Sequence, residues 1–138
     1  MAQASASARV ERLRSVPLFE GLSRRALQEV AAAAKEIEAP AGQVLVEPRM
    51  KGSGMFVIED GTVVVEKRGW KTELGPGEFF GELALLNSHG ERTARVRAKT
   101  DVRCLAVARR DFVRLLEQDP KLGIAMLETL AGRLEQTT

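Results

Sequence analysis

Four residues in the stretch GELALLNSHGERTARVRA, positions 81–98, have the chemistry to bind a phosphorylated sugar. Glu82 carries a carboxylate that can accept hydrogen bonds from sugar hydroxyl groups. Arg92 carries a planar guanidinium that can donate two hydrogen bonds to a phosphate, and Thr93 adds a hydroxyl beside it. Gly81 lacks a Cβ atom, so the backbone there can approach a ligand closely. One segment can therefore bind a ribose at one end and a phosphate at the other.

The apolar part of the same stretch also favours anion binding. GELALL predicts one or two turns of helix, and the first N–H groups of a helix have no intrahelical acceptor. The competing interpretation treats Glu82 and Arg92 as ordinary solvated charges on a surface loop, and their spacing alone favours it. The order of residue types around them, rather than the spacing, favours a binding site.

The elements that position this stretch begin with helices. ARVERLRSVPLF predicts a short helix that ends before Pro17, because proline cannot continue it. A second helix is predicted in EGLSRRALQEVAAAAKEIEAP, with Ser23 as its N-cap. Its apolar face is formed by Leu27, Val30, Ala31 and Ala34, and the pattern is broken at Pro40, Ala41 and Gly42.

The middle third is predicted to be β. GQVLVEP alternates, and GMFVIEDGTVVVEK contains two β-rich runs joined by Asp60-Gly61, a strong signal for a hairpin. EKRGWKTEL predicts another reversal around Gly69, and LGPGEFF predicts a turn followed by a brief strand. RTARVRA and DVRCLAVA alternate again on either side of a break at residues 99–101. Short strands with closely spaced turns are typical of a sandwich or a barrel.

The last third is predicted to be helical again. RRDFVRLLEQDP places Phe112, Leu115 and Leu116 on one face, and Asp119-Pro120 predicts an N-cap followed by a first-turn proline. The final helix has one apolar stripe, formed by Ile124, Leu127, Leu130, Ala131 and Leu134. We expect the leucines of this stripe to be at least partly core and to offer a dimer seam.

Composition limits the class of protein. The 138 residues suit one domain, and 44% hydrophobic with 29% charged residues is an ordinary globular balance. The net charge of +2 does not by itself indicate a polyanionic partner. A single cysteine excludes a disulfide framework, a four-cysteine zinc site and an iron–sulfur cluster built by this chain alone, and fits a cytoplasmic location. The sequence shows neither a membrane span nor a signal peptide, so no membrane partner is expected.

The stretch at 81–98 resembles the phosphate-binding cassette of cyclic nucleotide-binding domains, as found in the catabolite activator protein and protein kinase regulatory subunits. FGELALL and RTA are its two ends. The resemblance continues from about Val16 to the chain end, through VPLFEGLS, AGQVLVEP, GMFVIEDGTVVV, RVRAKTDVRCLAV and RRDFVRLL. Two features depart from the family: EPRMKGSGMF lacks the common Gly-Asp step, and Glu91 stands where some members have proline.

The resemblance implies a fold that is α+β but mainly β, a jelly-roll β-barrel flanked by N-terminal helices and two C-terminal helices. It implies one domain over residues 1–138. Within it we expect a disordered tail at 1–8, N-terminal helices at 9–34, the barrel at 35–108, the cassette at 79–94 and C-terminal helices at 109–138.

The ligand implied by the resemblance is cAMP or cGMP, with no cofactor and no metal. The cassette residues would be Gly81, Glu82, Leu83, Ala84, Arg92, Thr93 and Ala94. By this resemblance, Glu82 binds the ribose 2′-hydroxyl, and Arg92 pairs with the cyclic phosphate. The backbone N–H groups of Leu83 and Ala84 also bind that phosphate.

Two hydroxyl residues at the chain end are further candidates. In the bacterial activator type, the final helix dimerises and places two consecutive hydroxyl residues over the adenine. Thr137 and Thr138 fall at that position. A polar tail without contacts is the alternative.

We therefore expect a stand-alone regulatory module that binds a cyclic nucleotide and signals by rearranging its C-terminal helices. cAMP is favoured over cGMP, although Thr93 leaves cGMP open because its hydroxyl could bind a guanine amino group. A homodimer through the final helix, or another protein, is the expected partner. The bacterial activators carry a helix-turn-helix domain after this point and this sequence ends at Thr138, so no direct DNA binding is expected.

Two alternatives remain. A ligand-free interaction scaffold could keep the same fold, but the presence of both Glu82 and Arg92 argues against it. An enzyme is not expected, because the sequence offers no Ser-His-Asp set, metal cluster or poised carboxylate pair.

His89 is expected to be a solvated loop residue rather than a haem ligand. Cys104 is expected to be a buried structural thiol, and Trp70 an exposed turn residue rather than a cover for a base.

Overall fold

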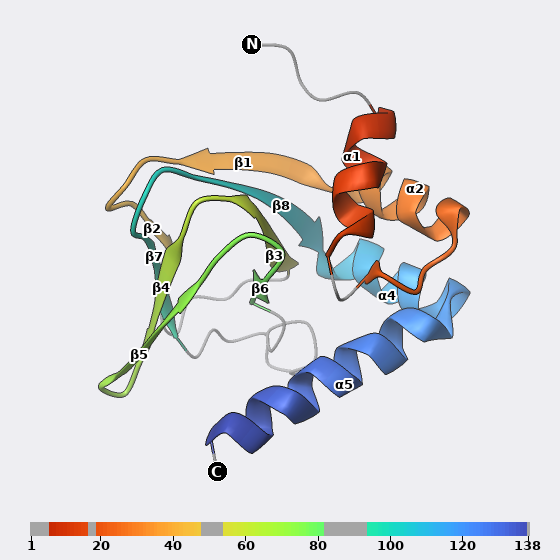
Figure 1. Ribbon diagram of the computed structural model, residues 1–138. Coiled ribbons are helices and arrows are strands. Elements are labelled where there is room, and N and C mark those ends of the chain that lie inside the picture. The colour runs from red at the N-terminus through yellow and green to blue at the C-terminus, as the bar shows by residue number, and fades with distance from the viewer. Residues whose placement is uncertain (1–5, 17–18, 48–53, 82–93, 138) are drawn as a thin grey trace. The chain divides into compact units, whose positions relative to one another are not determined.

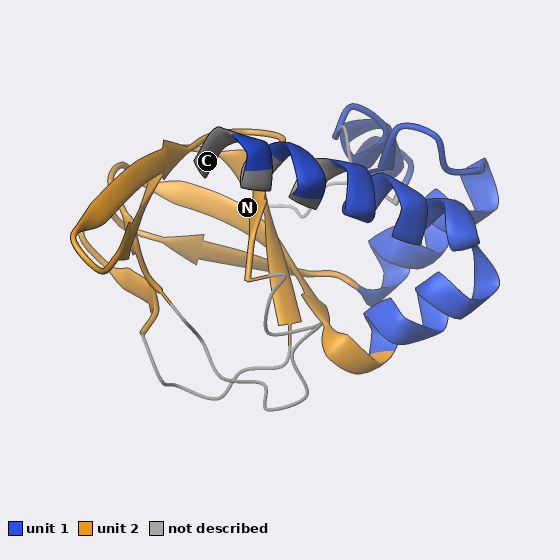
Figure 2. Cartoon of the chain, turned by 90° about the horizontal axis from the view of Figure 1, so that it is seen from below, with its two compact units in different colours: residues 1–33, 111–138 blue, residues 34–110 orange. Residues whose placement is uncertain are grey.

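The computed structural model describes residues 6–16, 19–47, 54–81 and 94–137 (Figure 1). The chain divides into two compact units (Figure 2). One unit comprises residues 1–33 and 111–138 and is helical, and the other comprises residues 34–110 and contains the strands. No helix among the described residues is both long and apolar enough to cross a membrane.

The helical unit begins with α1 (Ala6–Arg14) and α2 (Arg24–Ala33). As predicted, α1 ends before Pro17, and the Ser23 hydroxyl oxygen caps α2 by accepting the Ala26 N–H at 3.1 Å. The guanidinium of Arg9 donates to the carbonyl oxygen of Ala31 at 3.2 Å and so joins the two helices. Helix α1 already begins at Ala6, so residues 6–8 are helical rather than part of the expected tail.

The other helices are α4 (Arg109–Gln118) and α5 (Pro120–Thr137). The predicted start of α5 is confirmed, because the Asp119 carboxylate accepts the Lys121 N–H at 3.1 Å. The prediction that the leucines of the stripe are partly core is wrong for Leu127, which is 67% exposed, and the side chains of Leu130 and Leu134 lie outside the described residues. Ile124 of the same stripe is 57% exposed. Leu122 and Met126 are buried instead, since helical periodicity identifies apolar positions but not which of two adjoining stripes packs inward.

The strand unit contains two antiparallel sheets of four strands each. The first sheet has the order β1-β8-β3-β6, and the second has the order β2-β7-β4-β5. The strands are β1 (Lys35–Ala39), β2 (Val44–Val46), β3 (Gly54–Asp60), β4 (Val63–Lys67), β5 (Trp70–Leu74), β6 (Phe79–Phe80), β7 (Arg95–Ala98) and β8 (Val102–Ala108). Two antiparallel sheets, preceded and followed in the chain by helices, confirm the predicted jelly-roll class.

Strand β1 begins at residue 35, where the resemblance places the start of the barrel, although the local helical pattern continues as far as Pro40. The helix ends at Ala33, and β1 pairs with β8 through all five of its residues, from Lys35↔Ala106 to Ala39↔Val102. The local pattern is wrong here because pairing with a strand almost seventy positions away overrides the weak helical preference of KEIEA.

The two turns predicted around glycines differ in outcome. The reversal at Gly69 is confirmed as the β4–β5 hairpin, with Lys67 opposite Trp70 and positive φ at both Arg68 (48°) and Gly69 (79°). The hairpin predicted at Asp60-Gly61 is wrong. Strands β3 and β4 lie in different sheets, so this turn passes the chain from one sheet to the other.

Several such crossings meet at one corner of the strand unit, formed by residues 40–43, 61–62 and 98–101. Thr62 is its centre: its carbonyl oxygen accepts the Lys99 N–H at 2.9 Å, and its own N–H binds the Thr100 hydroxyl at 3.0 Å. The Asp101 carboxylate accepts the Ala41 N–H at 2.9 Å. The connections β1–β2, β3–β4 and β7–β8 are thereby fastened to one another.

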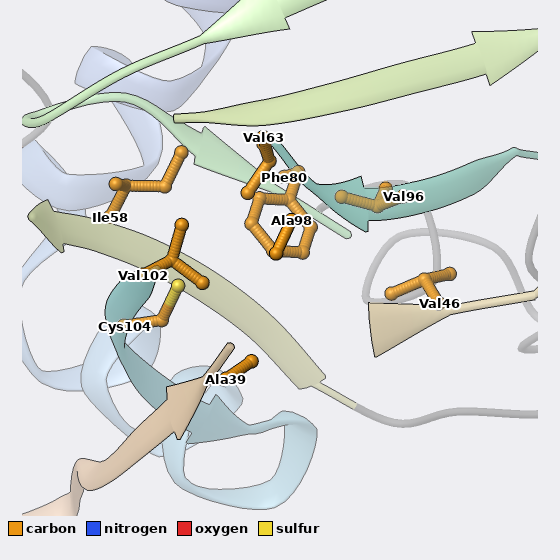
Figure 3. Close-up of a cluster of buried hydrophobic side chains, with 9 residues drawn as sticks. All are labelled: Ala39, Val46, Ile58, Val63, Phe80, Val96, Ala98, Val102 and Cys104. Carbon is orange, nitrogen blue, oxygen red and sulfur yellow. The ribbon is translucent and has the colours of Figure 1, made fainter. Parts of the chain in front are cut away.

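Between the sheets lies an apolar core (Figure 3). Its buried members come from both sheets and are Ala39, Val46, Ile58, Val63, Phe80, Val96, Ala98, Val102 and Cys104. Figure 3 shows Val46 and Val96 at one end of this cluster and Ile58, Val102 and Cys104 at the other. Burial of Cys104 and exposure of Trp70, at 52%, confirm both predictions for these residues.

We predict that Gly61→Ala destabilises the protein far more than Gly69→Ala. Both glycines have positive φ, which disfavours alanine by about 1–2 kcal/mol. A Cβ at Gly61 would also collide with the carbonyl oxygen of Asp101 and lie 2.7 Å from Cγ1 of Val102, whereas Gly69 faces open space. Urea unfolding should show a loss of about 3 kcal/mol or more for Gly61→Ala. Equal losses for the two variants would contradict the role assigned to the corner.

Candidate functional site

The structure describes the two ends of the predicted cassette. Gly81 and Ala94 are described, and the residues between them, at 82–93, lie outside the described part of the chain. The predicted site residues Glu82, Leu83, Ala84, Arg92, Thr93 and Thr138, together with His89, therefore lie outside it. Thr137 is the last residue of α5, and its side chain is likewise outside the description.

The first end of the cassette is held by strand β6. Phe79 and Phe80 pair with β3, opposite Val57 and Phe56, and the Phe56 and Phe80 rings stack with centroids 5.0 Å apart. Gly81 follows with φ +85°, a backbone conformation that side-chain-bearing residues rarely adopt. A glycine is therefore required where the chain leaves the sheet.

The second end of the cassette enters strand β7. Ala94 is half-buried, and β7 is paired on both sides, with β2 and with β4. Strand β6 belongs to the first sheet and β7 to the second, so the cassette connects the two sheets. Ala98 ends β7 at the corner, so the start of β7, which follows Ala94, lies at the opposite end of the strand.

The outward face of β7 carries cations that are already paired. The guanidinium nitrogen of Arg95 lies 3.2 Å from a carboxylate oxygen of Glu47, and that of Arg97 lies 3.0 Å from one of Glu66. Just after β7, the ammonium nitrogen of Lys99 lies 2.7 Å from a carboxylate oxygen of Glu73. All six side chains are partly exposed, so each pair contributes at most about 1 kcal/mol to stability. We call these three contacts the ion-pair row. Their main consequence is local neutralisation, because each described cation of this segment faces a carboxylate.

The inward face of the same sheet is apolar. Val96 and Ala98 of β7 are buried and lie opposite Val65 and Val63 of β4. Four partly buried apolar residues pack against this core: Leu45, Val65 and Leu74 from the second sheet and Phe56 from the first. Sequence reasoning did not single out these four residues, for which strand alternation was the available signal.

Metal chemistry has no support from the described residues. Among them, no group of three His, Cys, Asp or Glu side chains is placed to hold a metal ion.

Comparison with known proteins places the chain among relatives with a stated ligand class. A family model described as cyclic nucleotide-binding domain matches residues 36–119. A cyclic nucleotide-gated potassium channel of Rhizobium etli is 37% identical over 119 residues, which cover 86% of this chain and 33% of that protein. A cAMP-dependent protein kinase regulatory subunit of Aspergillus fumigatus is 37% identical over 111 residues, covering 75% of this chain and 26% of that protein.

A solved structure agrees with the fold. The crystal structure of the catabolite activator protein of Thermus thermophilus has a TM-score of 0.78 to this chain at 29% identity, over 88% of this chain and 59% of that one. The chain spans a third or less of the length of the two curated relatives, at 33% and 26%.

Cys104 carries a thiol, which can act as a nucleophile, but its buried surroundings disfavour the reactive thiolate form. Its side chain is 1% exposed and lies in the apolar core. The pKa of the thiol is raised from 9.0 to about 11, mainly by burial and in addition by the negative charge of Glu59. A thiol held in its neutral form is a poor nucleophile, which agrees with a structural role.

We predict that Cys104 resists a disulfide reagent in the folded protein and reacts fully in denaturant, with Cys104→Ala as the blank. The raised pKa also gives a pH dependence. Above pH 9.0 the unfolded chain loses the thiol proton while the folded chain keeps it up to about 11, so stability falls as pH rises through this interval. Rapid modification of the folded protein at neutral pH would contradict the buried placement.

Proposed function

This chain belongs to the cyclic nucleotide-binding domain family, and from that membership we propose that it is a regulatory module that binds a cyclic nucleotide, cAMP in preference to cGMP. The relatives named above support the ligand class, since one is described as gated by cyclic nucleotides and the other as dependent on cAMP. The relatives are much longer than this chain, so the activity that the module regulates is not part of the proposal.

Membership of the family is the observation that carries the proposal, and the cations beside the cassette bear only on which side chain binds the phosphate. RTARVRAK, residues 92–99, contains four cations. Three of them belong to the ion-pair row and already face carboxylates. The fourth, Arg92, lies outside the described residues, and we propose from the resemblance that its guanidinium donates two hydrogen bonds to the cyclic phosphate.

The other cassette residues have complementary roles in this proposal. The positive φ of Gly81 supports a sharp exit from β6 that brings the following residues towards a ligand. Glu82 accepts hydrogen bonds from the ribose 2′-hydroxyl, and the backbone N–H groups of Leu83 and Ala84 donate to the phosphate. Thr93 and Ala94 complete the segment beside Arg92.

The preference for cAMP over cGMP rests on the relatives rather than on the described side chains. The regulatory subunit from Aspergillus is described as cAMP-dependent. The Thr93 hydroxyl could bind the guanine amino group, so a comparison of the two nucleotides forms part of every binding test.

Signalling by the C-terminal helices is the finer part of the proposal. A nucleotide that binds better when α5 is ordered over it shifts the population towards that state. Exposed Ile124 and Leu127 give α5 apolar surface that a second copy or a partner protein can cover. Thr137 and Thr138 are the proposed contacts to the base.

A ligand-free interaction scaffold is the competing function. It would use the same jelly roll and the same exposed apolar positions of α5 without a nucleotide. The ion-pair row does not distinguish the two functions, because it stabilises the sheet in either case. Arg92 and Glu82 do distinguish them, because only the receptor uses these side chains.

We predict that Arg92→Ala weakens cAMP binding by about a hundredfold or more, because it removes the charge partner of a buried phosphate. Stability should change by less than about 0.5 kcal/mol, since Arg92 serves the ligand. Displacement of a fluorescent cAMP analogue measures the affinity. In the wild type, cAMP should also slow amide hydrogen exchange in α5, and the variant should lose this response.

Arg97→Ala is the matched control for this prediction. It removes a cation from the same strand segment, 43% exposed and paired with Glu66. It should leave the affinity for cAMP unchanged and lower stability by at most about 1 kcal/mol. Equal losses of affinity in the two variants would remove the special role of Arg92.

We predict that Glu82→Ala weakens the binding of cAMP by about tenfold to a hundredfold, because a charged hydrogen bond to the ribose is lost. 2′-Deoxy-cAMP lacks the hydroxyl that donates a hydrogen bond to Glu82, so the wild type and the variant should bind this nucleotide equally weakly. Glu73→Ala, which removes an exposed carboxylate paired with Lys99, is the control and should not change either affinity. A loss that is the same for both nucleotides would show that Glu82 does not bind the ribose.

A further inference from the structure

The tip of the β4–β5 hairpin carries an unusual set of side chains. Residues 67–71, KRGWK, contain three cations, one tryptophan and no acidic residue, and we call them the hairpin tip. Trp70 is 52% exposed, and it is the one tryptophan in a chain that has no tyrosine. Single exposed apolar residues are common, so the argument depends on what surrounds this indole.

The backbone of the hairpin tip breaks a local rule. Arg68 has φ +48° and is the one non-glycine residue with positive φ among the described residues. Two-residue turns of this kind favour Asn or Asp followed by Gly, because both central positions need positive φ. An arginine there is disfavoured conformationally, and local rules are most often broken where a side chain has a function.

The charges of the hairpin tip also differ from those of the rest of its sheet. The cations of the ion-pair row face carboxylates, and Glu66 and Glu73, the acidic residues nearest the tip in sequence, are engaged there. Glu66 lies opposite Lys71 in the strand register, but its carboxylate pairs with Arg97. Among the described residues, no ion pair joins a carboxylate to Lys67, Arg68 or Lys71. The tip therefore presents concentrated positive charge around an indole.

The position of the hairpin tip makes it convex. The last pair between β4 and β7 is Glu66↔Arg95, whereas β4 and β5 remain paired as far as Lys67↔Trp70. The tip thus projects past the neighbouring strand, as Figure 1 shows. The hairpin tip contains a single aromatic ring, so it offers no row of rings on which successive bases could stack.

We infer that the hairpin tip is a docking site for the surface of an anionic lipid bilayer. An indole with an apolar body and an N–H group is suited to the level of the lipid headgroups. Lysine and arginine side chains around it are attracted to anionic headgroups, and the attraction adds over several cations. Contact at this level needs no membrane-spanning segment, and it is independent of the binding of a cyclic nucleotide.

Trp70 makes this inference directly measurable, because its fluorescence is the tryptophan fluorescence of the whole chain. The 138-residue protein is titrated with vesicles of phosphatidylcholine mixed with phosphatidylglycerol, and with vesicles of phosphatidylcholine alone. The emission should shift to shorter wavelength, and quenching by acrylamide should fall, with the anionic vesicles only. Raising the ionic strength should reverse both changes, because salt screens exposed charges.

Two double variants distinguish the effect of the hairpin tip on vesicle binding from the effect of the protein's net charge. The double variant Arg68→Glu with Lys71→Glu should lower the apparent affinity for anionic vesicles by roughly tenfold or more. Arg24→Glu with Arg25→Glu changes the net charge equally at exposed positions of α2 and should leave the affinity nearly unchanged. Trp70→Ser, followed by co-sedimentation with vesicles, should also weaken binding. Circular dichroism checks that each variant is folded.

Four results would overturn the inference. The first is unchanged Trp70 emission with anionic vesicles, and the second is an equal response to neutral vesicles. The third is an equal loss of affinity in the two double variants, which would indicate net charge rather than the tip. The fourth is a response to a single-stranded oligonucleotide or to polyglutamate without a response to vesicles, which would assign the tip to another class of partner.

Discussion

The strand unit depends on the corner at which three of its connections between the sheets are fastened together. Thr62 binds Lys99 and Thr100 through backbone and hydroxyl groups, and Asp101 binds the backbone of Ala41. Gly61 is essential there because a side chain would occupy the space of Asp101 and Val102. These contacts fix how the two sheets face each other and therefore which side chains form the core between them.

Fixing one end of the sheets has a consequence for the other end. Strand β7 ends at the corner, so its start, at Arg95, is held by pairing with β2 and β4 and by the ion pair of Arg95 with Glu47. At the other end of the cassette, the two-residue strand β6 is held by pairing with β3 and by the stack of Phe56 on Phe80. The two described ends of the cassette, Gly81 and Ala94, therefore adjoin strands of different sheets.

Local features were predictable from the sequence, and features that depend on distant residues were not. The caps at Ser23 and Asp119 and the turn at Gly69 follow from nearby residues, and the structure confirms them. Strand β1 and the crossing at Gly61 depend on partners about 70 and 40 positions away, which no local pattern contains. The identification of the cassette depends on the order of its residue types and on its resemblance to a family. The match to that family confirms the resemblance, whereas the individual roles of Glu82 and Arg92 stay predictions.

Calorimetric titration of the nucleotide-free protein with cAMP and with cGMP, side by side, tests the central claim most directly. The account predicts saturable binding of cAMP with an affinity of about micromolar or tighter, that is about 8 kcal/mol of binding free energy, and weaker binding of cGMP. Absence of heat with both nucleotides, at two temperatures and at protein concentrations well above micromolar, would contradict it. The interaction scaffold would then be the better description of this jelly roll.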